Sequence, residues 1–118
     1  MVSTTPNQAR TKAEEELFEL QAEFCKGMAH PKRIYILNLL KGGEKTVNVL
    51  ARLTGIPQAN VSQHLGVLRQ LGIVDTRRNG SSVYYSIGDH RVVEACELVR
   101  GSIGERLRKS RAVLEVTA

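Results

Sequence analysis

The spacing of hydrophobic residues changes along this chain, and the change constrains its fold. As far as Gly72 the apolar residues recur every three or four positions, which is the period of amphipathic helices. From residue 73 to residue 87 the segments are rich in β-formers on both sides of Asn79-Gly80, a dipeptide that favours a hairpin turn with positive φ at both residues. After Asp89, a suitable N-cap, the helical period returns. The chain is therefore predicted to be mostly α-helical with one small β-hairpin.

Prolines and glycines divide the helical part into separate segments. Pro31 ends one helix and opens the next, because proline lacks the amide hydrogen that continues a helix but fits a first turn. The helices predicted before the hairpin span about residues 11–29, 31–41, 46–53 and 57–72, and a long helix follows from residue 89 to about 114. A chain of 118 residues has room for one domain. We expect a flexible tail over residues 1–10 and a single domain over residues 11–114.

The charge is concentrated in the middle of the chain. The formal net charge is +5, but residues 24–88 carry nine lysines and arginines against two acidic residues. A basic centre between less basic flanks predicts a partner rich in phosphate, such as a nucleic acid. The alternative is a solvated surface with a chance excess of bases.

The helices predicted over residues 46–53 and 57–72 suit a helix-turn-helix, because a short segment containing Gly55 joins them. Successive residues of a helix lie about 100° apart, and this step sets one polar face opposite the stripe of Val61, Leu65 and Leu68. That face carries Asn60, Ser62 and Gln63 in its first half, flanked later by Arg69. Short amide and hydroxyl side chains read base edges in the major groove, and no acidic residue occurs from residue 53 to residue 73. We predict a DNA-reading helix; an ordinary solvated helix face is the alternative.

The predicted hairpin carries two arginines, Arg77 and Arg78, next to its turn. Arginines on an extended hairpin beside a reading helix can lie along the phosphate backbone or enter the minor groove. We predict that both contact DNA, with a merely solubilising turn as the alternative.

Three stretches in order resemble the ArsR/SmtB family of winged helix-turn-helix repressors. They are CKGMAHPKRIYILNLL over residues 25–40, NVSQHLGVLRQLGIV over residues 60–74 and VYYSI over residues 83–87. The resemblance covers about residues 13–107, and it implies a winged helix-turn-helix homodimer, a palindromic double-stranded DNA operator and repression relieved by an effector. The positions that match the family's base contacts are Gln58, Ser62, Gln63 and His64. Ala59 departs from the serine common at its position, so one polar contact is expected to be absent.

The first and last predicted helices agree with a dimer, which the resemblance places at these two helices. Their apolar residues exceed what one small core needs, and those of the last helix alternate in spacing between three and four, as in a coiled-coil seam. These residues are Leu17, Leu20, Phe24 and Met28 in the first helix, and Val92, Cys96, Val99, Ile103 and Leu107 in the last.

The metal sites known in this family are not matched. Residues 46–49 contain no cysteine where some members have a Cys-x-Cys box. The positions that match a second site, between the paired last helices, are Asp89, Arg91, Ser102 and Glu105, which lack two imidazoles and include a positive charge. We therefore predict no metal and no cofactor.

The two cysteines, Cys25 and Cys96, lie on the helices expected to form the dimer interface. They are candidates for a redox or sulfur-species switch through a disulfide or polysulfide bridge, or for binding a soft ion such as arsenite or Cu(I) with a third ligand. The alternative is that both only pack, since cysteine is often a small buried hydrophobe. Thiol-sensing relatives typically place their first cysteine on the second helix, where this chain has residues such as Asn38, so the match is imperfect.

Other function classes are less well supported by the sequence. A winged-helix module that uses the same face for protein contacts is one alternative. No cysteine–histidine pair, carboxylate dyad or phosphate loop occurs at usable spacing, so the chain is not expected to be an enzyme. The absence of a long apolar run or a signal peptide predicts a cytoplasmic protein with no membrane partner.

Overall fold

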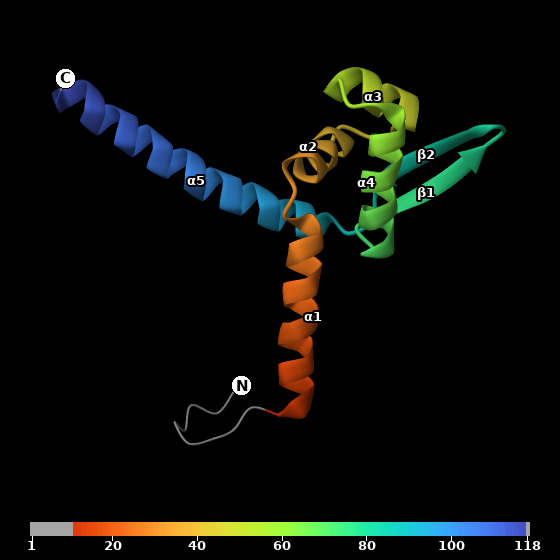
Figure 1. Ribbon diagram of the computed structural model, residues 1–118, viewed down its shortest axis with the longest axis horizontal. Coiled ribbons are helices and arrows are strands. Elements are labelled where there is room, and N and C mark those ends of the chain that lie inside the picture. The colour runs from red at the N-terminus through yellow and green to blue at the C-terminus, as the bar shows by residue number, and fades with distance from the viewer. Residues whose placement is uncertain (1–10, 118) are drawn as a thin grey trace.

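The computed structural model describes residues 11–117, so the tail predicted over residues 1–10 lies outside the described residues. The elements follow the predicted order of four helices, a hairpin and a last helix (Figure 1). They are α1 (Lys12–Met28), α2 (Pro31–Leu40), α3 (Val47–Thr54), α4 (Gln58–Gln70), β1 (Val74–Asn79), β2 (Ser82–Ile87) and α5 (His90–Thr117).

Capping residues explain where the helices begin and end. Thr11 and Glu14 form a capping box at the start of α1, each side chain bonded to the other residue's backbone amide. His30 caps α2, because its Nδ1 accepts a hydrogen bond from the amide of Lys32. Gly55 ends α3 with a φ of 73°, a conformation that favours glycine. The predicted helix boundaries are therefore confirmed to within a few residues.

The hairpin turn lies one residue later than the sequence predicted. Asn79 pairs with Ser82 at the end of the antiparallel ladder, so the two turn residues are Gly80 and Ser81. Gly80 has a φ of 62°, and no residue other than glycine has a positive φ in the described part of the chain. The prediction of positive φ at Asn79 is therefore wrong. Glycine in the first turn position alone is typical of a type II′ turn, which suits the twist of a hairpin as well as the predicted turn does.

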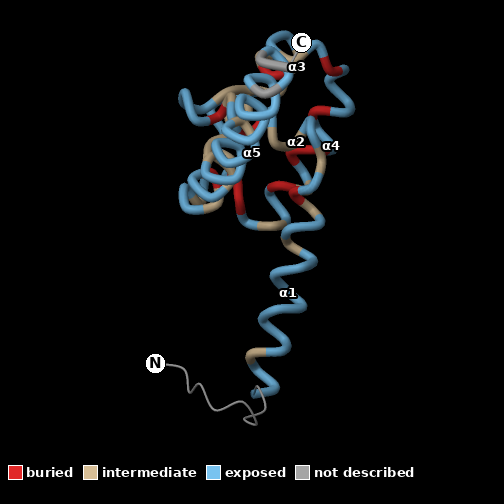
Figure 2. The backbone as a smooth tube through the Cα atoms, turned by 90° about the vertical axis from the view of Figure 1, so that its left-hand side faces the viewer, coloured by how far each residue is buried: buried red, intermediate tan, exposed pale blue. Residues whose placement is uncertain are grey.

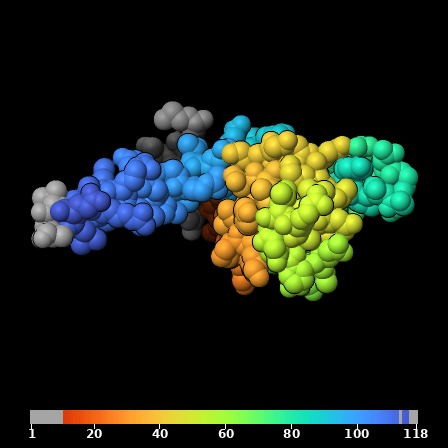
Figure 3. All heavy atoms as spheres, turned by 90° about the horizontal axis from the view of Figure 1, so that it is seen from above, coloured from red at the N-terminus to blue at the C-terminus, as the bar shows by residue number. Residues whose placement is uncertain are grey.

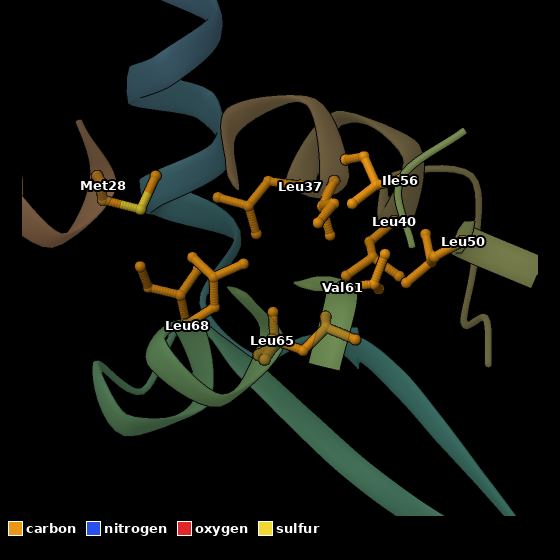
Figure 4. Close-up of a cluster of buried hydrophobic side chains, with 11 residues drawn as sticks. Met28, Leu37, Leu40, Leu50, Ile56, Val61, Leu65 and Leu68 are labelled. Atoms are coloured by element: carbon orange, nitrogen blue, oxygen red, sulfur yellow. The ribbon is translucent and has the colours of Figure 1, made fainter. Parts of the chain in front are cut away.

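The core lies between α2, α3, α4 and the base of the hairpin (Figure 4). Its fully buried side chains include Ile36, Leu50, Leu65 and Leu68. Lys45, between α2 and α3, exchanges two backbone hydrogen bonds with Tyr85 of β2, so the loop before α3 is pinned to the hairpin. α4 is thus held on its inner side by a continuous apolar core.

By contrast, α1 and α5 project from this core (Figure 1), and Figure 3 shows α5 extending away from it. Figure 2 shows α1 as mostly exposed, and Met28 is its only buried residue. Apolar side chains remain exposed along both helices, among them Leu20 at 67% and Ile103 at 51%. No described helix is both long enough and apolar enough to cross a bilayer.

Candidate nucleic-acid interface

The helix-turn-helix formed by α3 and α4 presents one face of α4 to solvent. Val61, Leu65 and Leu68 are completely buried and fix the rotation of the helix about its axis. Outside this stripe the structure exposes most of the predicted DNA-contacting residues: Gln58, Asn60, Ser62, Gln63 and Arg69. The helical step of about 100° therefore predicted correctly which side of α4 is accessible.

His64 differs from the other predicted contacts, because its side chain is only 9% exposed. Its Nδ1 accepts a hydrogen bond from Nε of Arg33, at 3.2 Å, and its ring lies 4.6 Å from the ring of His30. Burial and the neighbouring cations lower the pKa of His64 below its ordinary value. His64 lies one helical turn from Val61 and beside Leu65, on the inward side of α4. The structure therefore places His64 on the inward side of α4, so it is not among the predicted contacts that the exposed face presents.

Arg77, on the hairpin, is held by contacts within the protein. Its guanidinium donates two hydrogen bonds to the carboxylate of Glu44, in the loop pinned to β2, and lies 4.8 Å above the ring of Tyr84. The hydrogen bonds from Arg77 lower the pKa of the Glu44 carboxyl. Sequence analysis did not identify Glu44, because no local pattern links residues so far apart in the chain.

Arg78 lies on the other face of the hairpin, since side chains alternate along a strand. It shares this face with Val74, which is buried in the core beside α4, and its cross-strand partner is Val83. Arg78 is exposed and makes no hydrogen bond or ion pair within residues 11–117. The two adjacent arginines thus differ. Arg77 is neutralised by the carboxylate of Glu44, whereas Arg78 is exposed on the hairpin face that adjoins α4.

A second feature is an apolar groove of about 690 Å³ between α1, α2 and α5. Phe24, Met28, Ile34, Val92, Val99 and Ile103 supply much of its lining. Cys25 and Cys96 also line it, and both are free thiols, Cys25 exposed and Cys96 partly buried. The fold therefore brings the two predicted thiol residues to one groove.

Two of the four positions that match a family metal site, Asp89 and Arg91, form an ion pair with each other. The carboxylate of Asp89 accepts hydrogen bonds from Nε of Arg91 at 3.0 Å and from its backbone amide at 3.1 Å. The side-chain hydrogen bond from Arg91 is the main cause that lowers the pKa of Asp89. Within the described residues, no three histidine, cysteine or acidic side chains gather in a way that suits a metal ion.

Comparison with known proteins agrees with this geometry. Residues 30–76 match the family described as bacterial regulatory protein, arsR family. The chain is 41% identical over 102 residues to the uncharacterized HTH-type transcriptional regulator Rv0081 of Mycobacterium tuberculosis, covering 86% of this chain and 90% of the relative. It is 36% identical over 92 residues to a biofilm growth-associated repressor of Xylella fastidiosa, covering 78% and 80% of the two chains.

Solved structures show the same fold. The homodimeric winged helix-turn-helix DNA-binding domain of Mb0332 from Mycobacterium bovis superposes with a TM-score of 0.75 at 31% identity, covering 85% of this chain and 93% of that one. These proteins are named as a transcriptional regulator, a repressor and a winged helix-turn-helix DNA-binding domain, which confirms the predicted fold and function class. The chain belongs to the ArsR family of transcriptional regulators and has its winged helix-turn-helix DNA-binding fold.

Proposed function

We propose that this regulator is a homodimeric repressor that places the α4 helix of each copy in successive major grooves of a palindromic operator. The observation that carries the proposal is the exposed face of α4, which is polar, free of acidic residues and fixed on a buried core. Its amide and hydroxyl side chains suit base edges, and Arg69 suits a phosphate. The proposed base contacts are Gln58, Asn60, Ser62 and Gln63.

The hairpin supplies a second contact in this proposal. The side chain of Arg78 is exposed on the hairpin face that adjoins α4, so it is the proposed phosphate contact of the hairpin. Arg77 contributes less, because a phosphate must compete with Glu44 for its guanidinium.

Dimerisation through α1 and α5 is supported by their exposed apolar side chains. Leu17, Leu20, Val99, Ile103 and Leu107 are each more than half exposed in the single chain. Large exposed apolar side chains in such number mark a protein interface, and the solved neighbour from Mycobacterium bovis is homodimeric. Two-fold symmetry then sets the two α4 helices about 34 Å apart on a palindromic site.

The proposal is tested by selecting duplexes of about 30 base pairs from a random library with the protein at neutral pH. The expected result is an enriched palindrome, bound with a log–log salt slope of several units, because phosphate contacts release counterions. A winged-helix module for protein contacts predicts no enriched palindrome and no steep salt slope, and that result would reject the operator proposal.

We further propose that thiol chemistry in the groove relieves repression, and the shared groove of Cys25 and Cys96 is the supporting observation. When diamide oxidises two thiols, a disulfide forms, and the two electrons and two protons pass to the nitrogen–nitrogen double bond of diamide. The resulting bridge would tie α1 to α5 and change the spacing of the two α4 helices. A polysulfide bridge or a soft metalloid ion would join the same helices.

Operator binding by the wild type, Cys25→Ser and Cys96→Ser tests this regulation. Diamide is expected to weaken wild-type binding about 5–150-fold, the usual range of allosteric coupling, and to leave both variants unchanged. If the wild type does not respond, or if all three proteins respond alike, the cysteines serve packing alone.

A further inference from the structure

Arg33 joins three helices behind the reading face of α4. It lies in α2, its terminal nitrogen donates a 2.7 Å hydrogen bond to the carbonyl oxygen of Gly27 in α1, and its Nε donates to Nδ1 of His64 in α4. Because two different nitrogens of one planar guanidinium make these bonds, moving α4 relative to α1 must disturb at least one of them. Arg33 is therefore placed to fix the position of α4 relative to α1.

The last turn of α1 also packs closely against the end of α4. A Cβ atom built on Gly27 would lie 2.7 Å from Cδ1 of Leu71, which is the C-cap of α4. Only a residue without a side chain fits this approach unless Leu71 moves. α1 is therefore held against α4 at two places, the hydrogen bonds of Arg33 and the contact between Gly27 and Leu71.

The bond from Arg33 requires His64 to be neutral. An imidazole Nδ1 that accepts a hydrogen bond carries no hydrogen, so the ring proton is on Nε2. The charged or titratable groups that face this ring all come from the start of α2: His30, Lys32 and Arg33. α1 contributes the carbonyl oxygen of Gly27, which accepts a hydrogen bond from Arg33. Within the described residues no carboxylate shifts the pKa of His64.

We propose that Arg33 and His64 are positioning residues of α4 and that protonation of His64 releases α4, so that operator binding weakens in acid. A proton on Nδ1 would point at the N–H of Arg33, setting two donors and two positive charges against each other in a buried place. The bond would be lost, and with it one of the two ties between α1 and α4. The inference rests on the proposed operator binding.

The sign of the pH effect separates this role from direct DNA contact. A histidine that touches phosphate or bases gains attraction for DNA when it becomes positive, so acid would strengthen binding. Lower pH also raises the net positive charge of the whole protein, which favours DNA in the same direction. Weaker binding in acid therefore requires a structural cause that outweighs both effects.

The experiment measures binding of the enriched duplex at about pH 7.5 and in steps down to about pH 5, because the pKa of His64 lies below the ordinary histidine value. Wild-type affinity is expected to fall at least about fivefold at the lower pH. His64→Asn offers Oδ1 as an acceptor for Arg33 and does not titrate, so it should bind like the wild type at neutral pH and lose nothing in acid. His90→Asn, at the start of α5, is the matched control expected to keep the wild-type pH dependence.

Several outcomes would overturn the inference. The inference fails if wild-type affinity stays constant or rises in acid. It also fails if His64→Asn loses affinity in acid as the wild type does. If His64→Asn does not fold, NMR of wild-type protein with ¹⁵N-labelled histidine replaces it: Nδ1 of His64 must be unprotonated at neutral pH, and its protonation must coincide with a change at the Arg33 Nε–H signal. Independent titration of the two signals would reject the inference. No binding at neutral pH would reject the proposed function instead.

Discussion

The α4 face and the surfaces of α1 and α5 are both exposed in the single chain, but their chemistry is opposite. The α4 face is polar, and behind it Val61, Leu65 and Leu68 are fully buried. By contrast, α1 and α5 expose large apolar side chains, among them Leu20 at 67% and Val99 at 60% exposure. A polar face is stable in water until a charged partner displaces that water, whereas an exposed apolar surface gains free energy when it is covered. The polar face of α4 is thus complete in the single chain, whereas the exposed apolar side chains of α1 and α5 gain free energy only when they are covered, as the proposed second copy would do.

Breaking the apolar surface should have the largest effect. Ile103→Glu sets a charge in the seam of α5, so we expect a monomer by analytical ultracentrifugation and a loss of operator affinity of about 100-fold or more, because the two half-sites are no longer bound together. Ile103→Leu keeps an apolar side chain at the same position of the seam and should remain dimeric. A dimeric Ile103→Glu protein would show that α5 does not form the interface.

Changes on the polar face should be smaller and should alter sequence preference. Gln63→Ala is expected to cost about 1–3 kcal/mol of operator binding and to relax the preference at one base pair in each half-site, as loss of a base contact does. It should leave the dimer intact. Gln70→Ala removes the same side chain from the far end of α4 and serves as the matched control. Equal losses in both variants would argue against base reading by the first half of α4.

The two hairpin arginines offer a finer test of the polar face. Arg78→Ala should reduce the log–log salt slope by about one for each copy and weaken binding alike for all sequences, as loss of a phosphate contact does. Arg77→Ala should have less effect, because Glu44 already neutralises its guanidinium. Glu44→Gln should free Arg77 and strengthen binding to non-operator DNA. A larger loss in Arg77→Ala than in Arg78→Ala would show that phosphate displaces Glu44 easily.

Local chemistry explains which parts of the fold were predictable from the sequence. Proline and glycine at Pro31, Gly55 and Pro57 act on the backbone of their own segment, so the helix boundaries followed from them. The buried stripe of α4 followed from spacing alone. The hairpin was predicted, but its turn was placed one residue early, because Asn79-Gly80 and Gly80-Ser81 are both acceptable turn pairs and the register of the strands decides between them.

The contacts that tune the site could not be predicted, because they join distant segments. Arg33 reaches His64, 31 residues away, and Arg77 reaches Glu44, 33 residues away. His64 was assigned to DNA by resemblance, although the helical step places it next to the buried stripe. Resemblance gives the residue type at a position, but the direction of the side chain depends on what packs around it.

The smallest predicted effect is a pH dependence of stability, which is expected for α4 and not for the apolar surfaces of α1 and α5. The pKa of His64 is lowered in the folded protein, so between that pKa and the unfolded value of about 6.5 the unfolded chain binds more protons. The contribution of His64 to the free energy of unfolding should therefore be complete above this interval. It should decrease as the pH is lowered through the interval, and a lower urea midpoint at fixed protein concentration would show this decrease. His64→Asn should flatten this dependence. The contributions of Glu44 and Glu97, whose pKa values are also lowered, are lost only as the pH falls below the ordinary value of a glutamate carboxyl. The apolar side chains of α1 and α5 have no group that titrates in the His64 interval, and the dimer dissociation constant should stay constant while the midpoint falls. A dissociation constant that rises with the same pH profile would show that α4 and the dimer surfaces are coupled through the contacts of Arg33.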